Sequence, residues 1–246
     1  MDLEICVNSV QSAYNAKAGG ATRIELCHNL NEGGTTPSYA AIRYCAQELK
    51  LRTYVLIRPR TGNFVYSDLE FEAICQDVQI CKQLGAKGVV VGFLDEKFCV
   101  DRAKTEKIAN LCGDMELTFH RAFDICKDPI GGLETIIGCG YNRILTSGQK
   151  LTALEGMPFL KELKERAAGR IKIMAGSGIS AVNAMEIIKT TGVDEIHASC
   201  KSVIGRDENL RMEHILDVSN AEYTETDSQS VKSLLEVVKN FINTQQ

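Results

Sequence analysis

Short apolar runs alternate with longer amphipathic stretches along most of the chain. Eight of the runs have the length and composition of β-strands, and they cover residues 3–7, 24–27, 53–58, 88–92, 116–120, 143–147, 171–175 and 195–198. Helical spacing of apolar residues separates them, most clearly over 68–84, where Ile74, Val78 and Cys81 lie on one stripe and Gly85 follows. The pattern therefore predicts a strand–helix alternation without a domain break.

The alternation predicts an α/β fold with a parallel sheet. Eight strand–helix units in 246 residues give about 31 residues per unit, the size of βαβ repeats. We therefore predict a single (β/α)8 TIM-barrel domain over residues 1–246. An open doubly wound sheet is the alternative, but no GxGxxG sequence follows the first strand, where Asn8, Ser9, Val10 and Gln11 begin the helix instead.

The chain after the eighth strand departs from this rhythm. Residues 201–227 form a long, mostly polar connection, and a last helix is predicted over about 228–241, with Val231, Leu234 and Val238 on one stripe. Long connections in compact domains are often lids or binding segments. We therefore regard 201–227 as a candidate lid.

Composition narrows the choice of partners and compartment. A net charge of -4 and a pI of about 5.7 give no basic surface, so we expect no nucleic acid and no anionic membrane as partner. No apolar run reaches membrane-spanning length, and the first four residues lack the features of a secretory signal. We expect a cytoplasmic protein whose ten cysteines are reduced thiols, and the absence of CxxC argues against a zinc ribbon.

Chemistry-bearing residues gather where the predicted strands end. In a TIM barrel these ends surround the mouth, where barrel enzymes hold their active sites. Glu4 with Cys6 and Glu25 with Cys27 repeat one spacing on the first two strands, and alternation places each pair on a single face. A carboxylate in an apolar strand needs a cation partner or a raised pKa, and Arg58 is the predicted partner.

The most polar strand end is Thr118–Asp124, which brings His120, Arg121 and Asp124 together. Gly176–Ser177–Gly178 joins the seventh strand to a helix, and its N–H groups either cradle an anion or simply permit a tight turn. The remaining candidate ligand-binding residues are Arg60, Ser147 and His197. Plainer interpretations stand beside these: His120 as a core histidine, the cysteines as core filling and the two glutamates as structural ion-pair partners.

The same residues carry a family resemblance. Eight segments are similar to the signature blocks of the CutC copper-homeostasis family, and they cover residues 3–6, 23–27, 32–38, 56–60, 66–68, 118–124, 145–149 and 173–178. The resemblance implies a cytoplasmic, usually homo-oligomeric TIM barrel associated with copper handling. It also implies Cys6 and Cys27 as the Cu(I) ligands. The chain departs from the family pattern at Thr61 and beyond Lys201.

Two functions compete at this mouth. Thiolates suit Cu(I), and neighbouring strands lie about 4.8 Å apart, although barrel shear could set Cys6 and Cys27 at different heights. The alternative is an isomerase, lyase or hydrolase acting on a small anionic or phosphorylated metabolite. Arg58 would then clamp the anion, and His120 or Glu25 would transfer protons beside Asp124. A scaffold without chemistry is a third interpretation, which predicts internally paired charges and no open pocket.

Overall fold

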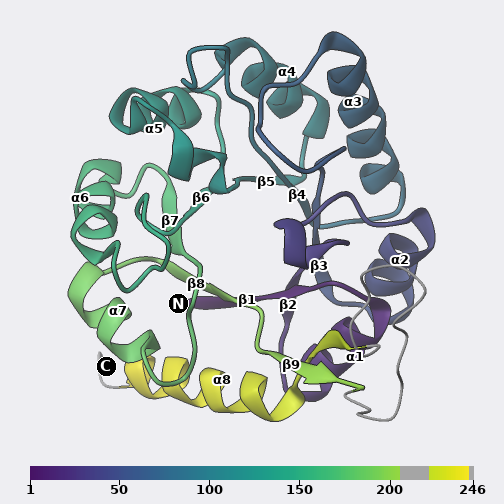
Figure 1. Ribbon diagram of the computed structural model, residues 1–246, viewed down its shortest axis with the longest axis vertical. Helices are drawn as coiled ribbons and strands as arrows, with labels where there is room; N and C mark the ends of the chain where they lie inside the picture. The colour runs from purple at the N-terminus through teal and green to yellow at the C-terminus, as the bar shows by residue number, and fades with distance from the viewer. Residues whose placement is uncertain (206–221, 244–246) are drawn as a thin grey trace, which may run out of the picture.

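The predicted strands pair side by side in chain order, and the eighth pairs with the first, so the sheet closes into a barrel (Figure 1). The computed structural model describes residues 1–205 and 222–243. The barrel strands are β1 Asp2–Val7, β2 Arg23–Leu26, β3 Arg52–Leu56, β4 Gly88–Val91, β5 Glu116–Phe119, β6 Arg143–Thr146, β7 Lys172–Ala175 and β8 Glu195–Ala198. This topology confirms the (β/α)8 prediction, because an open sheet would leave β1 and β8 apart.

Helices form a ring around the strands (Figure 1). They are α1 Val10–Ala18, α2 Tyr39–Arg43, α3 Asp68–Gln83, α4 Arg102–Cys112, α5 Pro129–Gly138, α6 Met157–Ala167, α7 Ala184–Thr191 and α8 Ser228–Asn243. The predicted 68–84 helix corresponds to α3, which begins with a capping box between Ser67 and Glu70. Short helical turns, η1 Leu30–Glu32, η2 Tyr44–Glu48 and η3 Arg121–Ile125, lie between these elements.

The connection after β8 contains strands at both of its ends. β9 Lys201–Ile204 pairs antiparallel with β10 Tyr223–Thr226, and the Asn8 amide donates to the Thr224 carbonyl at 3.1 Å, so the hairpin is tied to the loop after β1. Residues 206–221, the middle of the candidate lid, lie outside the described residues. None of the helices in the described ranges is long and apolar enough to cross a bilayer.

Charged side chains fill the barrel interior at the amino ends of its strands. Arg23 Nε donates to Glu4 Oε2 at 2.7 Å, and Arg23 Nη1 donates to Glu195 Oε2 at 2.7 Å. Arg143 reaches the same Glu195 oxygen at 2.9 Å, and both guanidinium groups lie over the Tyr54 ring. All five residues are buried. This ionic layer fills the barrel at the amino ends of its strands, so a cavity can form only at the carboxyl ends.

Candidate functional site

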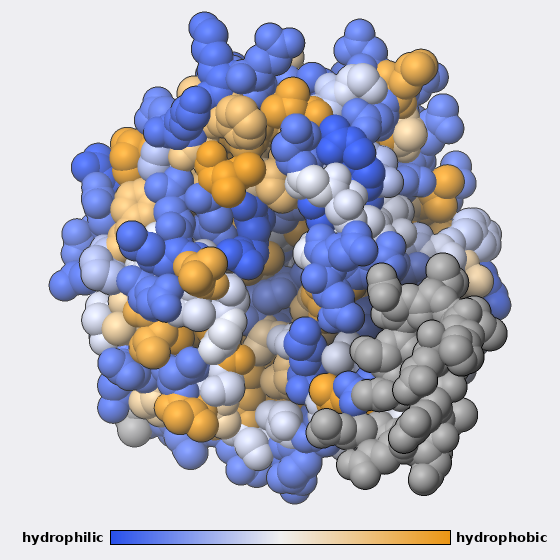
Figure 2. Space-filling model, viewed as in Figure 1, coloured by the Kyte–Doolittle hydropathy of each residue, from blue (hydrophilic) through white to orange (hydrophobic). Residues whose placement is uncertain are grey.

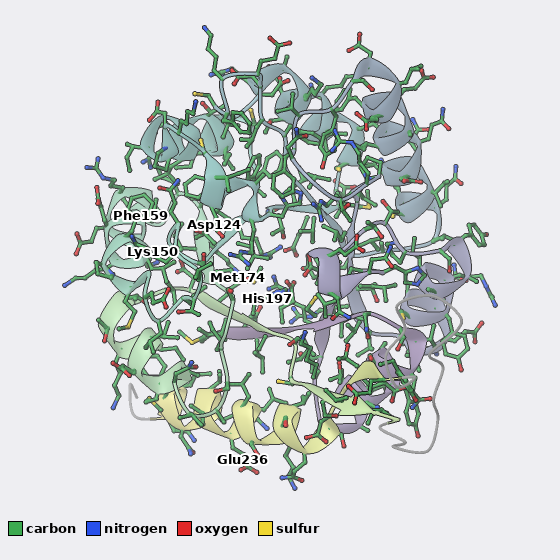
Figure 3. All side chains as sticks on the ribbon, viewed as in Figure 1. Asp124, Lys150, Phe159, Met174, His197 and Glu236 are labelled. Carbon is green, nitrogen blue, oxygen red and sulfur yellow. The ribbon has the colours of Figure 1, made fainter. Side chains whose placement is uncertain are left out.

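A cavity of about 360 Å³ opens at the carboxyl ends of the strands. Figure 2 shows hydrophilic side chains around a hollow near the centre of this face, and Figure 3 places His197 inside the ring while Glu236 lies outside on α8. The sequence-predicted residues that line it are Cys6, Glu25, Cys27, Arg58, His120, Arg121, Ser177, Gly178 and His197. An open cavity of this size argues against a scaffold with a sealed mouth.

The two thiols meet at the inner end of the cavity. Strand register sets Cys6 beside Glu25, and Cys27 donates its N–H to the Val7 carbonyl, so the two cysteines are staggered along the barrel. Their Sγ atoms nevertheless lie 3.9 Å apart. Ligand atoms of Cys6, Glu25 and His197 also lie within 4.8 Å of one another. Barrel shear therefore does not separate the thiols beyond the reach of one metal ion.

His197 links the two glutamates of the first strands. Its Nδ1 lies 3.0 Å from Glu4 Oε1, and its Nε2 lies 3.4 Å from Glu25 Oε2. The pKa of Glu4 falls to about 2, because Arg23 and His197 outweigh the effect of burial. The pKa of Glu25 is raised, chiefly by burial. Glu4 is thus a carboxylate that accepts from Nδ1–H and orients the imidazole, whereas Glu25 is the more easily protonated partner.

The predicted ion pair between Arg58 and the glutamates is wrong. Register on β1 and β2 sets Arg23 beside Glu4, and Arg23 makes that ion pair. On β3, Tyr54 is the residue beside Glu25, so Arg58 lies four residues further along, about 13 Å nearer the mouth. Arg23 was identifiable from the sequence, since it precedes Glu25 by two residues and so shares its inward face.

Arg58 instead fastens the loops at the mouth. Its Nη1 donates to the carbonyls of Glu32 and Gly34 at 3.1 and 2.8 Å, and its Nη2 donates to the Gly62 carbonyl at 2.9 Å. Its backbone also pairs with Thr36. Both ends of the guanidinium are therefore occupied by the loops after β2 and β3, and the predicted two-point clamp on a ligand is not available.

His120 lies buried in the cavity wall beside Phe64, whose ring centroid is 4.8 Å away. Its Nδ1 accepts a hydrogen bond from the Ala122 N–H at 3.1 Å, so the neutral ring carries its proton on Nε2. Burial and the nearby Arg58 lower the pKa of His120 to about 3. Gly92 provides the space, because a Cβ there would come within 2.4 Å of His120 Nδ1. His120 is therefore a neutral donor at physiological pH.

Asp124 lies outside the residues found to line the cavity. Its carboxylate accepts from Arg121 Nε at 2.7 Å, from the Ser147 N–H and hydroxyl, and from the Thr146 hydroxyl. Figure 3 shows Asp124 on the β6 side of the ring. These bonds indicate that Asp124 holds the loop after β6 in place and also positions Arg121.

The other predicted residues either line the cavity or bond to the loops around it. Arg60 and Ser147 are not among the residues that line the cavity. Arg60 forms an ion pair with Glu70 and donates to the Val65 carbonyl, and Ser147 donates its hydroxyl hydrogen to Asp124. Gly176 serves close packing, because a Cβ there would lie 2.6 Å from Leu145 Cδ1, while Ser177 and Gly178 face the cavity with positive φ angles. Lys201 also lines the cavity, and no motif singled it out.

Gly34 lies in the loop after β2 and packs closely against Leu56 and Cys27. Its φ is +88°, and an added Cβ would lie 2.5 Å from Leu56 Cδ2 and 3.4 Å from Cys27 Cβ. We expect Gly34→Ala to lower the free energy of unfolding by about 3 kcal/mol or more, as left-handed strain and overpacking add. Gly140→Ala is the control, because its φ is +78° but nothing lies within 4 Å. If urea unfolding showed the same loss of free energy for Gly34→Ala and Gly140→Ala, the close packing around Gly34 would be contradicted.

The comparisons with known proteins agree with this fold. A family model described as the CutC family matches residues 1–202. The human copper homeostasis protein cutC homolog is 41% identical over 245 residues, covering 98% of this chain and 90% of its own length. A family protein CutC from Pasteurella multocida is 43% identical over 201 residues, 82% of each chain. The crystal structure of a putative copper homeostasis protein CutC from Streptococcus agalactiae matches with a TM-score of 0.77 and 33% identity, over 81% of this chain and 98% of that one.

Proposed function

This chain belongs to the CutC family, and from that premise we propose that it binds Cu(I) at the inner end of the cavity, with Cys6 and Cys27 as thiolate ligands and His197 as the neighbouring nitrogen donor. The observation that carries the proposal is the 3.9 Å separation of the two Sγ atoms beside an imidazole and a carboxylate. Location in the cytoplasm and assembly as a homo-oligomer, which the family resemblance implies, belong to the same proposal.

The donor set fits a soft cation. Two metal–thiolate bonds of about 2.3 Å, the value known for zinc, span up to about 4.6 Å, so sulfurs 3.9 Å apart can share one ion. Thiolates prefer Cu(I) to hard cations such as Mg²⁺. The carboxylates of Glu4 and Glu25 add negative charge nearby, and Glu4 fixes the ring of His197 as an outer partner does in metal sites.

Copper is the cargo in this proposal. The cavity connects the thiols to solvent, so an ion can enter and leave without opening the barrel. The ten cysteines are all unpaired, in line with a reducing compartment, and the human relative bears the name of a copper homeostasis protein.

The pH dependence of binding tests the proposal. Hydrogen bonding with Cys27 and burial raise the pKa of the Cys6 thiol well above 9.0, so that thiol is protonated at neutral pH and must lose its proton when it binds the metal. We expect the Cu(I) affinity to rise about tenfold or more per pH unit between about pH 6 and 8. Anaerobic competition with a chromogenic Cu(I) chelator measures this slope. A pH-independent affinity would exclude Cys6 as a ligand.

A further inference from the structure

We propose that the same cavity holds a second binding site, in which Arg58 Nε–H and His120 Nε2–H bind the carboxylate or phosphate group of a small metabolite. The site lies nearer the mouth than the thiols, because Arg58 follows Leu56, the residue of β3 that strand register sets level with Cys27. It goes beyond copper binding and makes use of donors for which a metal ion has no need.

Arg58 is a buried cation that lacks a carboxylate partner. Arg58 is 5% exposed, and its Nη groups make three hydrogen bonds, from Nη1 to the Glu32 and Gly34 carbonyls and from Nη2 to the Gly62 carbonyl. Within residues 1–205 and 222–243 it forms no ion pair, and its Nε is buried without a hydrogen-bond partner. The Tyr66 hydroxyl, which lies close to Arg58, is likewise buried without a hydrogen-bond partner among the described residues. An unpaired buried charge is costly, so the structure is ready to accept an anion.

His120 contributes the second donor. The Ala122 N–H occupies Nδ1, which places the ring proton on Nε2, and Nε2 is buried without a partner in the part of the chain that the structure describes. Buried polar groups are almost always satisfied, and leaving one unsatisfied costs about 1–3 kcal/mol. Arg58 and His120 line the same cavity, and their two unsatisfied donors support a ligand group that accepts from both.

The Phe64 ring packs against both donor residues. The guanidinium carbon of Arg58 lies 5.0 Å from the centroid of the Phe64 ring, and that ring lies 4.8 Å from the His120 ring. All three residues line the cavity. The apolar wall lowers the local dielectric and strengthens hydrogen bonds to an anion. Lys201 adds positive charge to the cavity lining.

The donors and the space define the ligand class. A carboxylate or a phosphate has oxygens that can accept from both N–H groups, whereas a neutral ligand would leave the charge of Arg58 uncompensated. A cavity of about 360 Å³ exceeds what a metal ion fills and lies within the range of small-molecule sites. We therefore assign a small metabolite with one such acidic group.

Two substitutions of His120 distinguish the loss of its Nε2–H donor from a change in side-chain packing. In His120→Asn the side-chain carbonyl can still accept from the Ala122 N–H, but the outer donor is lost. In His120→Gln the amide nitrogen reaches the position of Nε2 and keeps a donor there. His28→Asn serves as the control, because His28 is not among the residues found to line the cavity.

Inorganic phosphate and acetate are the probes, titrated separately into metal-free full-length protein by calorimetry. We expect wild type, His120→Gln and His28→Asn to bind at least one of them, and His120→Asn to bind it at least about tenfold more weakly. The stronger probe identifies the acidic group. Equal affinity of His120→Asn and wild type, or no binding of either anion to wild type, would overturn the proposal.

A spectroscopic measurement on wild type covers the case in which His120→Asn does not fold. The Arg58 Nε–H resonance of ¹⁵N-arginine-labelled protein should move during the titration, and an unmoved resonance at saturation would also overturn the proposal. Anion binding should persist in Cys6→Ser/Cys27→Ser, because neither thiol belongs to this site. Retention there, with Cu(I) binding lost, would show that the two sites are independent.

Discussion

Cys6→Ser/Cys27→Ser is expected to bind Cu(I) at least about a hundredfold more weakly than wild type. Hydroxyl oxygens are hard, weak ligands for Cu(I), and the change removes both sulfurs of the pair at the inner end of the cavity. The substitution changes side-chain volume little, so the barrel should stay folded. Anaerobic competition against a Cu(I) chelator gives the affinity, and circular dichroism verifies the fold.

The appropriate control removes a thiol elsewhere. Cys139 is partly buried at the end of α5 and is not among the residues that line the cavity, so Cys139→Ser should keep wild-type affinity. Each single variant, Cys6→Ser or Cys27→Ser, should lose most of the affinity, because one sulfur cannot replace the pair. Full affinity in the double variant would mean that copper binds elsewhere in the chain.

Arg23→Met is expected to lower the free energy of unfolding by about 3–5 kcal/mol. Arg23 is 1% exposed and bonds to both Glu4 and Glu195, so its removal leaves Glu4 without its cation deep in the barrel and weakens the neutralisation of Glu195. Methionine fills a similar volume, which separates the loss of charge from the loss of packing. Urea unfolding at neutral pH measures the change.

Two further variants define the origin of that loss. Arg52→Met removes an arginine that is about half exposed and makes a long ion pair of 3.7 Å with Asp2. We expect it to lower the free energy of unfolding by no more than about 0.5 kcal/mol. Adding Glu4→Gln to Arg23→Met should recover part of the lost free energy of unfolding, since it removes one of the carboxylates left without a cation partner. A loss from Arg23→Met as small as that from Arg52→Met would refute the role of the ionic layer.

The fold was predictable because periodicity and unit length suffice to define it. Each predicted strand overlaps one barrel strand, and the Ser67–Glu70 capping box marks the start of α3. The strands at either end of 201–227 were missed, because β9 and β10 lie in a polar stretch and pair with each other across a long sequence separation. Local pattern carries no information about such a pairing.

The residues of the site were predictable in part, and their pairing was not. The barrel prediction gathers residues from the carboxyl ends of the strands, and Cys6, Glu25 and His197 do lie together in one cavity. The partner of Glu4 depends on the register between β1 and β2, which one strand's sequence does not specify. That partner is Arg23, not the predicted Arg58. The role of Asp124 as an acceptor for loop N–H groups likewise depends on the fold of the β6 loop, far along the chain.

X-ray absorption at the copper edge of the Cu(I)-loaded protein tests the central claim most directly. The account predicts two sulfur neighbours at about 2.3 Å in wild type and in Cys139→Ser, and their loss in Cys6→Ser/Cys27→Ser. A first shell of nitrogen and oxygen alone in wild type, or an unchanged sulfur shell in the double variant, would contradict it.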